Sequence, residues 1–160
     1  IILLCNKPML PIVLYTILFL VTFFGMEFVA WFTHKYIMHG FLWFLHKDHH
    51  TGSQGFFERN DVFALIFAIP SWLFIMLGVI NNSVASIIIG AGMTAYGLAY
   101  FTVHDVFTHQ RLKWLRNSTN PYLMAVRRAH KMHHKHLERQ KGESFGFLIV
   151  PRKYFKKSAS

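Results

Sequence analysis

The sequence predicts an all-α integral membrane protein, a bundle of about three to four helical spans with a histidine-rich cap. Three observations support this fold class. The 160 residues are 53% hydrophobic and only 15% charged, whereas soluble domains carry about 25% charged residues. Three apolar segments are each close to the roughly 20 residues that cross a bilayer as a helix. Finally, ten of the 11 histidines follow a pattern that occurs twice, outside the middle of these segments.

The chain is expected to form a single membrane domain over residues 1–160. The predicted spans are residues 9–33, 62–80 and 84–103. The first span holds one charged residue, Glu27, and has no cleavage-site pattern, so we interpret it as a true span rather than a signal peptide. Pro70 in the second span is tolerated in a membrane helix. Glycines 90, 92 and 97 in the third span favour close helix packing.

An odd number of crossings places the two polar regions in the same compartment. These regions are residues 34–61 and 104–150, and a basic tail follows at 151–160. The net charge is +10, and Lys7 is the only basic residue on the opposite side of the predicted spans. Because loops rich in Lys and Arg stay in the cytoplasm, we expect both polar regions to be cytoplasmic. The basic residues accompany no nucleic-acid-binding motif, so we expect no nucleic-acid partner.

The histidine pattern consists of H-x4-H, which begins where a span ends, followed by H-x2-H-H. The first copy is His34, His39, His46, His49 and His50, and the second is His104, His109, His130, His133 and His134. On a helix the three imidazoles of H-x2-H-H lie within about 100° of arc, so they can converge on a metal. The two imidazoles of H-x4-H lie about 140° apart on a regular helix. They therefore reach different metals, unless a π-bulge brings them together. His136 is expected to be a spare surface residue.

This set of donors predicts two metal ions. The only cysteine is Cys5, which excludes a thiolate site. Ten imidazoles exceed the four ligands of one zinc and the one or two axial ligands of a haem. Two metals with four or five nitrogens each would keep open positions for O2, and a redox task selects iron over zinc. We expect two irons with O2 as co-substrate in a cytoplasmic di-metal cap, and zinc can replace iron during purification.

Two carboxylates lie next to expected ligands, Asp48 and Asp105. A carboxylate often accepts the second N–H of a metal-bound imidazole and thereby fixes the orientation of the ring. We expect this role for both residues, and the alternative is that they only solvate a helix. No catalytic residue is expected beyond the metal ligands.

The doubled array resembles the membrane fatty acid hydroxylase superfamily and, within it, the bacterial β-carotene 3-hydroxylases. The segments that carry the resemblance are residues 34–40, 57–62, 103–111, 129–134 and 144–148. The resemblance implies that the ten histidines bind two irons and that one oxygen atom of O2 is inserted at C3 of a β-ionone ring. A carotenoid from the bilayer would be the substrate, converted from β-carotene through β-cryptoxanthin to zeaxanthin.

The resemblance also implies a bacterial inner-membrane location and a reduced ferredoxin-like electron donor, which the basic cytoplasmic surface would help to dock. Two other functions remain open from the sequence. One is a di-iron hydroxylase acting on another membrane lipid, such as a sterol or a fatty acyl chain. The other is a membrane metal-binding or transport protein, which should place polar ligands within its spans, where Glu27 is the only charge.

Overall fold

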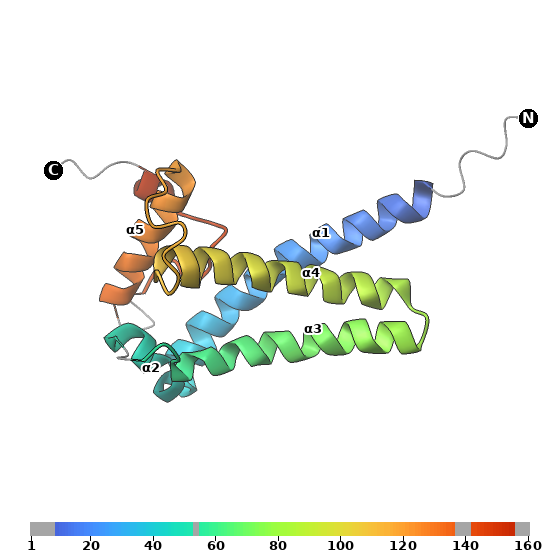
Figure 1. Cartoon of the computed structure of the whole chain (residues 1–160), viewed down its shortest axis with the longest axis horizontal. Helices are drawn as coiled ribbons and strands as arrows, with labels where there is room; N and C mark the ends of the chain where they lie inside the picture. Colours follow the sequence, from blue (N-terminus) through green and yellow to red (C-terminus); the bar gives the residue numbers. More distant parts are fainter. Residues whose placement is uncertain (1–8, 53–54, 137–141, 156–160) are drawn as a thin grey trace, which may run out of the picture. The chain divides into compact units, whose positions relative to one another are not determined.

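The computed structural model describes residues 9–52, 55–136 and 142–155 (Figure 1). These residues form helices, turns and irregular segments without a strand, which confirms the all-α prediction. In chain order the elements are α1 (Met9–Phe32), η1 (Thr33–Phe41), α2 (Trp43–Thr51), η2 (Arg59–Asp61), α3 (Val62–Ile80), α4 (Val84–Tyr100), η3 (Phe101–Thr108), α5 (Pro121–Lys135) and η4 (Arg152–Phe155). Two of them, η1 and η3, are π-helices, whereas η2 and η4 are single 3₁₀ turns.

Three continuous helical stretches are long and apolar enough to cross a membrane: Met9–Phe41, Arg59–Ile80 and Val84–Thr108. The first and third run beyond the predicted ends at residues 33 and 103, because each continues into a π-helix. Many large apolar side chains of these stretches are exposed, among them Ile12, Phe24 and Trp72. Such outward-facing apolar surface is what a helix needs in contact with lipid.

The described residues belong to two compact units, the first formed by residues 9–26 and 64–97. Within this unit, α3 and α4 pack closely through small residues. A side chain at Gly90 would collide with the backbone of Ser71 at 2.8 Å, and the Ser71 hydroxyl donates to the Gly90 carbonyl at 3.0 Å. Gly92 is equally close to Thr22 of α1, while Gly97 faces open space. Two of the three predicted glycines therefore serve close packing.

The second compact unit, residues 27–63 and 98–155, contains both polar regions and all the histidines. Its C-terminal segment, residues 142–150, is fixed by Glu27, the one charge of the first span. The buried Glu27 carboxylate accepts hydrogen bonds from the backbone N–H groups of Leu148 (2.9 Å) and Ile149 (3.3 Å). A side chain at Gly146 would collide with the same carboxylate. The buried charge is thus used to dock this segment against α1.

Helix α5 holds the other side of the C-terminal segment. It begins with Asn120 as N-cap, whose side chain accepts from the N–H groups of Tyr122 and Leu123, and with Pro121 in its first turn, a favoured start for a helix. The Tyr122 hydroxyl contacts the carbonyls of Phe147 (3.1 Å) and Leu148 (2.9 Å). Residues 156–160 of the expected basic tail lie outside the described residues.

Candidate metal centre

Both H-x4-H motifs involve a π-helix, because His34 and His39 lie in η1 while His104 lies in η3 with His109 at its C-cap. A π-helix joins residues five apart, and in η3 the N–H of His109 donates to the carbonyl of His104 at 2.9 Å. The rings of His104 and His109 are therefore only 4.7 Å apart, and those of His34 and His39 are 5.2 Å apart. Gly40 has non-helical backbone angles and ends the regular π-helical path directly after His39.

The histidine side chains gather into two groups. The first histidine group is His34, His39, His46, His50 and His133, and the second is His49, His109, His130 and His134. Within each group the candidate ligand nitrogens lie within 4.8 Å of one another. The ring of His104 borders the second group, 4.6 Å from the ring of His130 and 5.0 Å from that of His49. All ten expected ligands thus lie at one of the two groups, and His136 belongs to neither.

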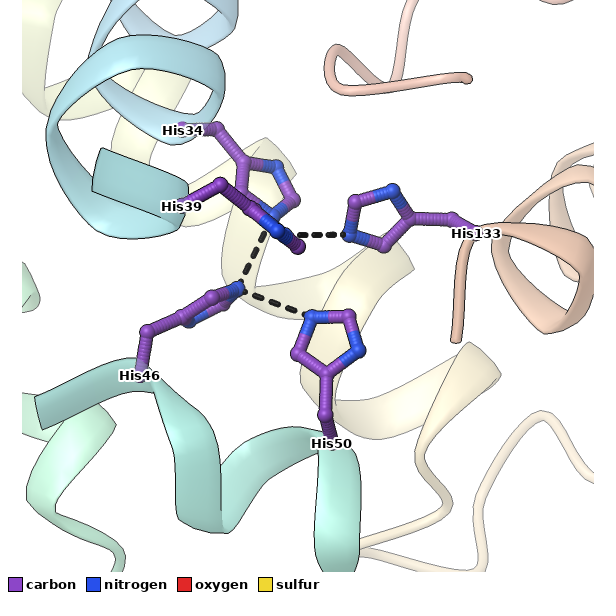
Figure 2. Close-up of side chains that lie close together, drawn as sticks. All are labelled: His34, His39, His46, His50 and His133. Carbon is purple, nitrogen blue, oxygen red and sulfur yellow. Dashed lines mark hydrogen bonds between the residues drawn. The ribbon is translucent and has the colours of Figure 1, made fainter. Parts of the chain in front are cut away.

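The two groups do not follow the two copies of the sequence pattern. The middle histidine of each H-x2-H-H, His49 or His133, lies in the group that is otherwise made by the other copy. On a helix, residues 46 and 50 point only about 40° apart, whereas residue 49 points about 100° away from residue 50. The arc alone had suggested that the three imidazoles converge on one metal. In the structure they are instead divided between the two groups. Figure 2 shows His133 of α5 facing His39 and His34 across the first group.

In the first group, unprotonated nitrogens point at one another. The Nδ1–H of His34 donates to the carbonyl of Phe145 (2.8 Å), and the Nδ1–H of His133 donates to that of Glu143 (3.0 Å). His46 Nδ1 lies 2.7 Å from the side-chain oxygen of Asn60. In neutral imidazoles these contacts leave a lone pair on each Nε2. Yet His34 Nε2 lies 3.1 Å from His46 Nε2 (Figure 2), and a metal cation between them would satisfy both acceptors.

The second group shows the same need in another form. The Nδ1 atoms of His49 and His104 face carboxylates, Glu58 at 2.8 Å and Asp105 at 3.2 Å. The opposite Nε2 atoms of both rings are buried and have no hydrogen-bond partner. Buried polar atoms are nearly always satisfied, so two orphaned imidazole nitrogens beside three more imidazoles fit a metal ion.

Burial keeps His46, His133 and His134 neutral at physiological pH. Desolvation, reinforced by neighbouring histidines, lowers the pKa of His133 to about 2 and that of His134 to about 4. Desolvation also lowers the pKa of His46 to about 3, against the opposing hydrogen bond to Asn60. A metal binds the neutral form of imidazole, so the residues fit a pair of imidazole-bound metal ions.

The residues that orient the imidazoles were only partly expected. Asp105 lies against His104, as proposed from the sequence. Asp48 is placed differently, because its Oδ2 accepts from the backbone N–H of Arg59 at 2.7 Å rather than from an imidazole. Glu58 instead takes the position on His49, and Asn60 that on His46. Neither residue stands next to a histidine in sequence. The carbonyls of Phe145 and Glu143 belong to the backbone, so no residue type in the sequence could have indicated them.

The chain is similar in sequence to known hydroxylases. The family model described as fatty acid hydroxylase matches residues 19–151. The chain is 47% identical over 131 residues to the β-carotene hydroxylase of Pantoea ananas, covering 82% of this chain and 74% of that protein. It is 43% identical over 126 residues to the β-carotene hydroxylase of Pseudescherichia vulneris, covering 79% and 71%.

A chloroplastic β-carotene 3-hydroxylase 2 of Arabidopsis thaliana is 37% identical over 131 residues, which cover 80% of this chain and 43% of the plant protein. No solved structure shows a significant match to this chain. The family match includes all ten clustered histidines, and two bacterial relatives are aligned over most of their length. The chain therefore belongs to the fatty acid hydroxylase family and, within it, to the β-carotene hydroxylases of bacteria and plants.

Proposed function

We propose that this protein is a β-carotene 3-hydroxylase, which uses O2 to hydroxylate β-ionone rings at C3. Reaction at both rings converts β-carotene through β-cryptoxanthin to zeaxanthin. The observation that carries this proposal is the 47% identity to a bacterial β-carotene hydroxylase over 82% of the chain, a stretch broad enough to include the two histidine groups. Residues 1–160 then act as one membrane domain.

The cofactor of this reaction is a pair of iron ions, held by the two histidine groups, with His104 completing the second group. When bound, the irons supply the activation of O2 that the hydroxylation needs. The chain's own residues present neutral imidazoles, fix their orientation through Nδ1 and keep water out. His46 and His133 are only 1% and 0% exposed. An all-imidazole site also accepts zinc, so a purified sample can carry zinc instead.

The reaction takes place at the cytoplasmic face of the bacterial inner membrane. Three apolar helices and the placement of basic residues by the positive-inside rule support this location. A carotenoid dissolved in the bilayer then reaches a site that adjoins the membrane-crossing stretches, since η1 and η3 continue two of them.

A reduced ferredoxin-like protein supplies the electrons. An open pocket beside the second group supports this partner. It is lined by His109, His130 and His134 together with Thr108, Arg127 and Lys131. Two basic side chains beside the candidate ligands suit an acidic electron donor, because complementary charge guides association.

The test is pigment analysis by liquid chromatography and mass spectrometry in a bacterial host that accumulates β-carotene. We expect products with one and two added oxygen atoms when the wild-type chain is produced. The His133→Ala variant should form none, whereas His136→Ala should behave as wild type. If the iron-loaded protein is present in membranes and β-carotene stays unchanged, the proposed substrate is wrong and other membrane lipids become the candidates.

A further inference from the structure

The residues behind the two histidine groups differ in charge. Three imidazoles of the first group are supported by neutral acceptors. These are the backbone carbonyls of Phe145 and Glu143 and the side-chain oxygen of Asn60, on His34, His133 and His46 respectively. None of the three carries a negative charge at the atom that faces the imidazole.

At the second group, His49 and the bordering His104 are supported by carboxylates. Glu58 faces His49 at 2.8 Å, and Asp105 faces His104 at 3.2 Å. Arg111 joins both acids, since its guanidinium lies 3.2 Å from Glu58 and 3.3 Å from Asp105. It also binds a third carboxylate, Asp61, at 2.7 Å.

Local structure holds this network in place. Gln110 has a φ of 56°, a left-handed conformation at the residue after His109, and the backbone N–H of Arg111 then donates to the Asp105 carbonyl at 3.0 Å. Glu58 and Asp61 form a reciprocal capping box at η2. The side chains of Glu58, Asp105 and Arg111 are each only 14–15% exposed, so solvent screens their charges only partly.

The network of Glu58, Asp61, Asp105 and Arg111 behind His49 and His104 has three carboxylates to one guanidinium and is therefore net negative, while Arg127 and Lys131 line the opposite, open side of the second group. A carboxylate that accepts the N–H of an imidazole raises the basicity of the other ring nitrogen and holds the ring in place. Nearby negative charge also favours a bound dication. Both effects act on His49 and His104 at the second group. They are missing at His34, His46 and His133 of the first group, whose Nδ1 atoms face uncharged oxygens.

We infer that Glu58, Asp105 and Arg111 are positioning residues that make the second histidine group the tighter of two unequal metal sites, so that it fills first. This inference rests on the proposed function only in requiring two metal sites. Loss of such a supporting contact typically lowers metal affinity by roughly 10–100-fold, which sets the size of the expected difference.

The experiment uses the full chain, purified in detergent and stripped with a chelator. Co²⁺ is the probe, titrated anaerobically while visible absorption and bound metal are measured. Wild type should bind two equivalents in two steps separated by at least about tenfold. Glu58→Gln keeps an oxygen acceptor for His49 but removes the charge. It should weaken the tighter step by roughly 10–100-fold and leave the weaker step unchanged.

Two further variants separate a positioning role from damage to the fold. Asp48→Asn removes a neighbouring carboxylate that accepts from the backbone N–H of Arg59 rather than from an imidazole. Both binding steps should stay within about twofold of wild type, a difference small beside the loss expected of a supporting contact. Asn60→Asp places a carboxylate on His46 of the first group. It should tighten the weaker step, a gain that misfolding cannot produce.

The outcomes are distinct. Two equivalents bound with one affinity would overturn the inference and leave the two-metal function intact. A single equivalent or none would contradict the proposed function itself. If Glu58→Gln leaves the tighter step in place, or Asp48→Asn weakens it equally, the contact between Glu58 and His49 is not the cause. If the Glu58→Gln variant binds no Co²⁺ at all, the Asn60→Asp variant provides the test. The inference is then overturned if Asn60→Asp does not tighten the weaker step.

Discussion

The two histidine groups resemble each other in their imidazoles and differ in the segments that hold them. Behind the first group lie the carbonyls of Phe145 and Glu143, supplied by a C-terminal segment that is itself anchored by Glu27 and Tyr122. Behind the second lie side chains joined by Arg111. The first group is therefore sensitive to the path of a distant backbone segment, whereas single side-chain substitutions can tune the second.

The largest effect expected from breaking this arrangement is loss of a ligand. His46 is 1% exposed, and its Nε2 lies 3.1 Å from His34 and 3.0 Å from His50. We expect His46→Ala to lower bound metal from two equivalents to one and to abolish hydroxylation. Metal analysis of the purified protein measures this, with His136→Ala as control. Retention of two equivalents by His46→Ala would remove His46 from the ligands.

The next prediction tests the exchange of histidines between the two sequence copies. His49→Ala combined with His109→Ala removes two ligands of the second group, and we expect about one equivalent of metal to remain. His49→Ala combined with His39→Ala damages both groups, so no metal should remain after dialysis. Effects within one site are non-additive and those in separate sites add. The reverse result would mean that each metal is held by one sequence copy alone.

The sequence was sufficient to predict the helices and the histidines because both have strong local signals. Apolar segments of near-span length placed α1, α3 and α4 within a few residues. The doubled pattern named the ten histidines that the fold brings together. The helices themselves continue past residues 33 and 103, since π-helices extend two of them by residues whose polarity resembles a loop.

The partition of the ligands and their supports depended on tertiary structure. A spacing of three or four residues fixes the angles between imidazoles on their own helix. Which group each imidazole joins depends on the facing helix, so that His49 and His133 each join the group made mainly by the other sequence copy. Glu58 and Asn60 lie in the connection between α2 and α3, where no periodicity predicts a contact. Backbone carbonyls such as that of Phe145 leave no mark on the sequence.

A smaller effect should follow from disturbing the segment behind the first group. In Gly146→Ala the new methyl group would collide with the Glu27 carboxylate, and overpacking of this kind typically costs about 1–3 kcal/mol. We expect a lower thermal unfolding midpoint in detergent and a weaker affinity of the first group, with the second group unchanged. Gly97→Ala is the matched control, because its added carbon meets nothing within 4 Å. Equal weakening of both sites would show that the segment supports them jointly.

The smallest effect is expected at the other anchor of the same segment. Tyr122→Phe removes a hydroxyl that lies 2.9 Å from the Leu148 carbonyl and 3.1 Å from that of Phe147. A hydrogen bond of this kind contributes about 1 kcal/mol, so the unfolding midpoint should fall less than in Gly146→Ala. Tyr15→Phe, in the first compact unit, controls for loss of a tyrosine hydroxyl.

Because Phe145 and Glu143 precede these carbonyls by only a few residues, Tyr122→Phe should weaken Co²⁺ binding at the first group before it affects the second. If the weaker step stays unchanged while the midpoint falls, Tyr122 stabilises the fold without positioning the carbonyls that orient His34 and His133.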